Sequence, residues 1–199
     1  PVVFVVRVSG DSSFSSVSVD DVEGGRLAAS HLGGLGRRRI AYVGGPDSIE
    51  QVRHRREGAR EIVAGTPEAI LEYIPTKKLT VMEGRAAGER IAAMEPRIRP
   101  DAVFAANDLL AMGLLQAFVM SRKIRVPEDI ALIGYDNIDF AESAIVPITT
   151  ISQPAAEIGR TAVDVLLREA DAGEDAVREQ FVCAPKLVVR ASTAGIKNT

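Results

Sequence analysis

Polar side chains follow two stretches whose apolar residues indicate buried strands. Asn107 and Asp108 come directly after residues 102–106, and Asp136 and Asn137 come directly after residues 130–135. In an open parallel α/β sheet, ligands bind outside the carboxyl ends of the strands. These amides and carboxylates could therefore form a site for a polar ligand. Asn and Asp also begin helices and turns, and the spacing leaves both interpretations open.

A basic cluster lies near the same predicted edge of the sheet. Arg53, His54, Arg55 and Arg56 occupy the first turns of a predicted helix that follows the strand at 39–43. One guanidinium could reach the carboxylates from this position. The two groups would be complementary, because arginine donates hydrogen bonds through a rigid fork and carboxylates accept them. Sugars, polyols and nucleosides need this mixture of donors and acceptors, whereas phosphate would require more positive charge.

Catalytic and metal-binding arrangements are hard to build from this sequence. His31 and His54 are the only histidines, both within predicted helices, and no residue pattern orients either one as a base. Because Cys183 is the single cysteine, an intrachain disulfide is excluded. We expect its side chain to be buried and to pack against apolar neighbours rather than act as a nucleophile. Neither a metal-ligand spacing nor a GxGxxG or GxxxxGK[ST] loop occurs. We expect no catalytic residue, metal or cofactor.

Composition further limits the classes of partner. The formal net charge of −3 and the absence of Trp argue against nucleic-acid binding through the overall field of this chain. No apolar run approaches the roughly 20 residues of a membrane span, and no signal peptide is visible. The single cysteine suits a cytoplasmic protein.

Alternating strand and helix patterns predict the fold class. Capping-box spacing recurs at Asp20 with Glu23, Ser48 with Gln51 and Thr80 with Glu83, before helices that end near residues 32, 64 and 94. Strands are expected between these helices. This alternation with short connections predicts βαβ units and a parallel sheet.

The two ends of the chain depart from this alternation. Residues 2–6 form an apolar run typical of a strand covered on both faces, and since intact domains seldom begin on a central strand, we expect a fragment. Past Asp136, an extended stretch at 149–152 precedes a helix from Pro154 to about residue 170. The stretch at 181–189 predicts one last strand.

Several motifs in order along the chain resemble one known family. FAANDLLAMG followed by IRVPEDIALIGYDN is similar to the effector-binding region of LacI/GalR-type bacterial transcription regulators. The segments SVSVDDVEGGRLAASHLGGLGRRRIAYVGGP, RREGAR, PITTISQPAAEIGRTAV and KLVVRAST extend the resemblance over essentially all 199 residues.

The resemblance implies a two-lobed, periplasmic-binding-protein-like α/β fold with parallel sheets flanked by helices and an effector in the cleft between the lobes. Residues 1–19 and 152–182 would be a remnant of the N-terminal lobe, and residues 20–151 and 183–199 a nearly complete C-terminal lobe. Such regulators bind operator DNA as homodimers through an N-terminal headpiece, which this chain lacks. The apolar helix at 109–120 is expected to serve partly as core and partly as the dimer contact.

The resemblance also assigns candidate ligand-binding residues. Asn107 and Asp136 match a hydroxyl-binding amide and carboxylate, and Arg55 matches the effector-contacting arginine of an R-x-x-G pattern. Asp108 lies beside this site and is expected to serve chiefly as a helix N-cap. Gln153 matches a residue at a crossing between the lobes.

The expected function is a ligand-responsive transcription regulator. Its effector would be a small polar molecule, such as a sugar, a polyol or a nucleoside or purine, sensed by lobe closure. The family often has Asp where this chain has Val6, which leaves the identity of the effector open. The alternative is a solute-binding protein of a sugar transporter, which a signal peptide in the full-length protein would distinguish from a regulator with a headpiece. An enzyme is a remote third possibility.

Overall fold

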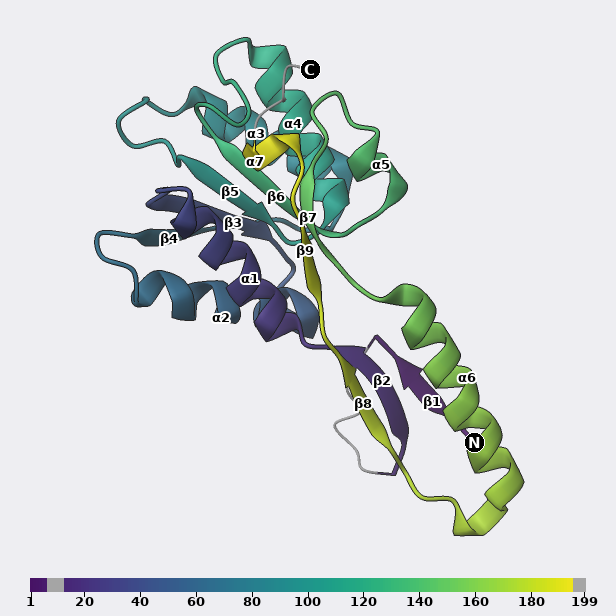
Figure 1. The fold of residues 1–199 in the computed structure, drawn as a ribbon. Coiled ribbons are helices and arrows are strands. Elements are labelled where there is room, and N and C mark those ends of the chain that lie inside the picture. The colour runs from purple at the N-terminus through teal and green to yellow at the C-terminus, as the bar shows by residue number, and fades with distance from the viewer. Residues whose placement is uncertain (7–12, 195–199) are drawn as a thin grey trace. The chain divides into compact units, whose positions relative to one another are not determined.

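The computed structural model describes residues 1–6 and 13–194 of this chain. The chain divides into two compact units, one formed by residues 1–20 and 153–185 and the other by residues 21–152 and 186–199. Figure 1 shows their strands and helices. Among the described residues, no helix has the length and apolar character needed to cross a bilayer.

The larger unit is built on a six-stranded sheet. Its strand order is β4-β3-β5-β6-β7-β9. Neighbouring strands from β4 to β7 pair in parallel, and β9 pairs antiparallel with β7. The predicted parallel α/β sheet is therefore confirmed. The strands are β3 (Arg39–Gly44), β4 (Ile70–Pro75), β5 (Ala102–Ala105), β6 (Ala131–Asp136), β7 (Thr149–Ser152) and β9 (Lys186–Val188).

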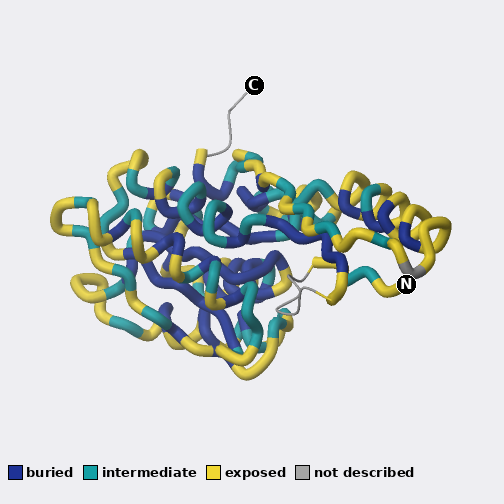
Figure 2. Tube along the Cα trace, turned by 90° about the horizontal axis from the view of Figure 1, so that it is seen from below, coloured by how far each residue is buried: buried dark blue, intermediate teal, exposed yellow. Residues whose placement is uncertain are grey.

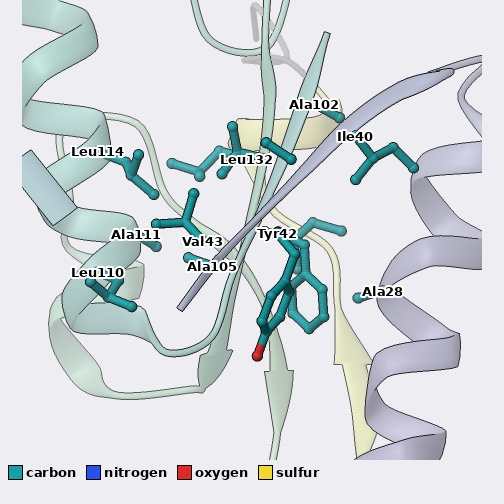
Figure 3. Packing of buried hydrophobic residues seen from close by; sticks show 14 of the residues in the cluster. Ala28, Ile40, Tyr42, Val43, Ala102, Ala105, Leu110, Ala111, Leu114 and Leu132 are labelled. Atoms are coloured by element: carbon teal, nitrogen blue, oxygen red, sulfur yellow. The ribbon is translucent and has the colours of Figure 1, made fainter. Parts of the chain in front are cut away.

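Helices cover both faces of this sheet. The helix α1 (Asp21–Gly34) packs beside α2 (Glu50–Ala64), and α3 (Val81–Ala93) packs beside α4 (Asp108–Ser121). Figure 3 shows Leu110, Ala111 and Leu114 of α4 on one side of the strands and Ala28 of α1 on the other. The central strands between them are buried, as the dark blue segments of Figure 2 show. Two short helices, α5 (Asp139–Glu142) and α7 (Ala191–Ala194), complete the unit.

Glycines set the distance between the helices of each pair. A Cβ atom on Gly25 of α1 would lie 2.0 Å from a carbonyl oxygen of α2, and one on Gly58 of α2 would lie 1.9 Å from a carbonyl oxygen of α1. Gly84 of α3 and Gly113 of α4 face the partner backbone in the same way, at 2.2 and 2.0 Å. Any larger residue would push the helix backbones apart. These contacts therefore fix the distance between α1 and α2 and the distance between α3 and α4.

The smaller unit is a three-stranded parallel sheet in the order β1-β2-β8. It consists of β1 (Val3–Val5), β2 (Ser15–Val19) and β8 (Gln180–Cys183), with α6 (Ala155–Ala172) and a short 3₁₀ turn η1 (Gly173–Asp175). The helix α6 packs on β1 and β2. The core of this unit is small: Val17, Val19, Ile158 and Ala162 form a buried apolar cluster, and Val165 of α6 is buried as well.

Two predictions about the ends of the chain are wrong. The stretch 181–189 contains two strands, β8 and β9, which belong to different sheets. Ala184 and Pro185 separate them, and proline cannot donate a ladder hydrogen bond. The strand β1 is not covered on both faces, since Val5 is 47% exposed and its neighbours are only partly buried.

The predicted capping residues have mixed outcomes. Thr80 caps α3 as expected, because its side chain accepts a hydrogen bond from the Glu83 N–H. The predicted cap at Ser48 is wrong, since α2 begins after Ile49, whose side chain makes no capping hydrogen bond.

Candidate functional site

The candidate site lies at the carboxyl edge of the six-stranded sheet. Asp136 is the last residue of β6 and pairs in register with Ser152 of β7. Asn107 follows β5 at the start of α4. Arg55 reaches this edge from α2, because its Nη1 lies 3.8 Å from the Asp136 Oδ1. The fold thus brings Arg55 to an edge whose side chains lie 52 and 81 residues further along the sequence.

Arg55 is buried, and four groups surround its guanidinium. Its Nε donates to the Asp21 Oδ1 at 2.8 Å, and its Nη1 donates to the Ala106 carbonyl at 2.7 Å. Its Cζ lies 3.5 Å from the centre of the Tyr135 ring, a cation–π arrangement. Only 6% of the Arg55 side chain is exposed, against 32% for Asp136. A ligand would therefore reach the Asp136 carboxylate more readily than the guanidinium.

The charges of this cluster support one another. Burial opposes the charge of Arg55, but Asp21, Tyr135 and Asp136 outweigh that effect and hold its pKa above the ordinary value. Burial raises the pKa of Tyr135, so its ring stays neutral beneath the guanidinium. With one arginine and two carboxylates, the cluster carries a net negative charge.

The backbone around Asp136 adopts a conformation that L-residues rarely take. Asp136 has φ +106° and the next residue, Asn137, has φ +57°. Such angles cost energy and persist only where the surrounding structure enforces them. The Asn137 Oδ1 accepts from Arg190 Nη2 at 2.8 Å, and its N–H donates to the Thr150 Oγ1 at 3.3 Å. These contacts fix the direction in which the Asp136 side chain leaves the sheet.

Asp108 supports this turn from inside the protein. Its carboxylate is fully buried and accepts from the Thr150 Oγ1 at 2.7 Å and from the Ile138 N–H at 3.0 Å. Gly134 makes room for it, since a Cβ atom there would lie 2.1 Å from the Asp108 Oδ1. Burial raises the pKa of Asp108 to about 6; the Asp136 charge adds to this rise, and the hydrogen bonds from Thr150 and Ile138 oppose it.

The prediction that Asp108 caps α4 is wrong. The cap is Asn107, whose Oδ1 accepts from the Leu110 N–H at 3.0 Å. A capping residue needs extended backbone angles, which Asn107 has, while Asp108 already belongs to the helix. The Asn107 Nδ2 lies 3.4 Å from the Leu79 carbonyl. Both polar atoms of Asn107 therefore have partners within the protein.

Gln153 occupies a different place from the other candidates. It follows Ser152, the β7 residue that pairs with Asp136, and it is half-buried. By chain contacts it belongs to the smaller unit, whereas Arg55, Asn107, Asp108 and Asp136 all belong to the larger one.

Sequence reasoning missed three residues that this structure places around the site. Asp21 pairs with Arg55, while Thr150 and Arg190 hold the turn after β6. The capping-box spacing assigns a role only to Asp20, the neighbour of Asp21 in the sequence. The polar residues of PITTIS (residues 147–152) indicate that side chains of β7 make polar contacts as well as apolar ones.

The arrangement suits hydrogen bonding to hydroxyl groups rather than metal binding. A partly exposed carboxylate accepts hydrogen bonds from hydroxyl groups, and an adjacent guanidinium favours the charged form of that carboxylate. Over residues 1–6 and 13–194, no group of three or more His, Cys, Asp or Glu side chains could hold a metal ion.

Comparisons with known proteins agree with the fold. The model of the periplasmic binding protein-like domain family matches residues 13–193. The HTH-type transcriptional regulator DegA of Bacillus subtilis is 37% identical over 184 residues, which are 89% of this chain and 52% of that protein. The chain spans about half the length of the curated relatives it matches.

Solved structures resemble this chain over nearly its whole length. A LacI family transcriptional regulator from Enterococcus faecium with bound ribose has a TM-score of 0.86 and 32% identity, covering 98% of this chain and 71% of that one. The complex of the transcriptional regulator CelR with cellobiose has a TM-score of 0.83 and 33% identity, covering 96% and 58%. The chain therefore belongs to the periplasmic binding protein-like domain family, in the form found in LacI family transcriptional regulators.

Proposed function

We propose that this chain is the effector-binding and dimerisation core of a LacI-type DNA-binding transcription regulator. It senses a small polar effector by lobe closure, and a headpiece outside this chain binds operator DNA in the cytoplasm. Similarity to HTH-type regulators supports this proposal over a solute-binding protein of a sugar transporter. A closing ligand acts only through unequal affinity for the open and closed states.

The observation that carries the proposal is the partly exposed carboxylate of Asp136 beside the buried Arg55. The net negative charge of this cluster disfavours phosphates and favours a neutral, hydroxyl-rich ligand. Ribose and cellobiose, which two of the similar regulators bind, are of this kind. We therefore place sugars first among the candidate effectors, ahead of polyols and nucleosides or purines.

The candidate residues take different roles in this proposal. Asp136 accepts hydrogen bonds from effector hydroxyls, and Arg55 orients that carboxylate and favours its charged form. Asn107 and Gln153 are proposed as further contacts. Asp108 does not contact the ligand in this proposal. Its fully buried carboxylate holds the turn after β6 by accepting from the Ile138 N–H.

Homodimerisation is part of the same proposal, and exposed apolar side chains of the larger unit support it. Phe140 of α5 is 65% exposed, Ile145 is 76% exposed, and Met120 near the end of α4 is 64% exposed. Exposed apolar side chains of this size mark a protein–protein contact where they form one continuous patch. Sedimentation of Phe140→Asp should then show a larger monomer fraction than the unchanged chain.

Calorimetry with ribose, cellobiose, a polyol and a nucleoside tests the effector site. We expect at least one of these to bind, and Asp136→Asn to weaken it at least tenfold, because a charged acceptor is lost. Asp139→Asn is the matched control, since it removes an exposed carboxylate three residues away and should bind as the unchanged chain does. Equal affinity of Asp136→Asn and the unchanged chain would refute the assignment of the site.

A further inference from the structure

A hollow lies on the outer side of α2, in the larger unit. It has a volume of about 460 Å³ and lies against β4, an edge strand of the six-stranded sheet. Its lining consists of Arg53, His54, Arg56, Glu57, Arg60, Leu71 and Tyr73. None of these residues belongs to the candidate effector site. The hollow has the size of a typical small-molecule pocket.

Three arginines give this hollow a positive charge. Arg53, Arg56 and Arg60 have the spacing i, i+3 and i+7, so they project from one face of α2. Arg55 points the other way, into the protein. The lining contains one carboxylate, that of Glu57. The hollow is therefore locally cationic on a chain whose formal net charge is −3.

The three arginines differ in what they contact. Arg56 is already engaged, with its Nη1 3.1 Å from the Asp47 Oδ1 and its Cζ 4.0 Å from the centre of the Tyr73 ring. Arg53 and Arg60 are exposed, and no acidic side chain in the described part of the chain lies within ion-pair distance of either. Two guanidinium forks therefore remain available beside a third that its neighbours hold in place.

We propose that this hollow binds a small phosphorylated molecule. Guanidinium groups donate to phosphate oxygens in pairs, and such charge-assisted bonds are the strong ones. Leu71 and the Tyr73 ring offer an apolar surface for the part of the ligand that carries the phosphate. The concave shape and limited volume fit a small molecule rather than a folded partner. This site would differ in charge from the negative cluster at Asp136.

Titration calorimetry with inorganic pyrophosphate tests this assignment on the full chain. We expect saturable binding with one site, weakened at least tenfold by the double change Arg53→Ala with Arg60→Ala. The matched control is Arg90→Ala with Arg97→Ala, which removes the same charge from exposed positions elsewhere in the larger unit. The control should bind pyrophosphate as the unchanged chain does, and circular dichroism should show both variants folded.

Three outcomes would overturn the proposal. These are no saturable binding of pyrophosphate, equal weakening in the two double variants, or loss of binding in Asp136→Asn with none in the Arg53 and Arg60 variant. The last outcome would place the anion at the candidate effector site. Because the proposal rests on α2 and β4 alone, it stands or falls independently of whether any sugar binds at Asp136.

Discussion

The buried carboxylate of Asp108 offers a test of how the turn after β6 is held. Replacing Asp108 with Asn keeps the size of the side chain. The amide oxygen can still accept from the Ile138 N–H, and the amide NH₂ can donate to the Thr150 hydroxyl, which is able to accept. The substitution therefore removes the ionisable proton and leaves the contacts in place.

The size of the effect follows from the pKa of Asp108. In the folded chain this pKa is raised to about 6 from an ordinary value of 3.8. The folded state therefore holds the proton more tightly than the unfolded state, and the stability from Asp108 is greatest below pH 3.8. It falls as the pH rises through about 6 and then stays lower. A difference of about two units between the folded and unfolded pKa values of Asp108 corresponds to about 3 kcal/mol in the free energy of unfolding.

Urea unfolding of both chains between pH 4 and pH 8 measures this effect. The amide in the Asp108→Asn variant cannot ionise, so the variant does not lose this stability as the pH rises. The free energy of unfolding of Asp108→Asn minus that of the unchanged chain should increase by about 2–3 kcal/mol between pH 4 and pH 7. A difference that stays constant with pH would refute the reasoning, because it would mean that Asp108 titrates alike in the folded and unfolded states.

Three further predictions follow from single contacts and are measured by the same unfolding assay. Gly25→Ala should destabilise the fold by at least about 1–3 kcal/mol through overpacking against α2, whereas Gly33→Ala, with nothing within 4 Å of its new Cβ, should stabilise by about 0.5 kcal/mol. Asn107→Ala should cost about 1 kcal/mol by removing the cap of α4, and no loss would mean that another group caps this helix. Arg55→Ala should cost about 3–5 kcal/mol, because it leaves Asp21 buried without its partner; a small loss would show that water reaches Asp21.

The larger unit was predictable because its central strands are covered on both faces. Residues 102–105 are all buried, and so are residues 131–135, so the continuous apolar runs in the sequence matched the strands closely. The smaller unit was harder to predict. Its β8 alternates between exposed and partly buried residues, and only Ala184 and Pro185 mark where it ends before β9 begins.

The site was predictable only in part, for reasons that are geometric. Strand ends in the sequence pointed to Asn107 and Asp136. Which of two adjacent polar residues caps a helix depends on backbone angles. The sequence does not contain these angles, so it does not distinguish Asn107 from Asp108 as the cap. The pairing of Arg55 with Asp21 depends on how α1 packs against α2. That contact arises between residues 34 positions apart.

The glycines near the site have a consequence for how its ligand preference could change. At Gly24 a Cβ atom would lie 2.4 Å from the Tyr135 hydroxyl oxygen, and Gly25, Gly58 and Gly134 have even less room. Any larger residue at these positions therefore forces neighbouring atoms to move and destabilises the fold, whatever the ligand. A combinatorial library that randomised every position around Arg55 would consist mostly of destabilised chains. New preferences are accessible mainly through positions such as Asp136, whose side chain reaches solvent.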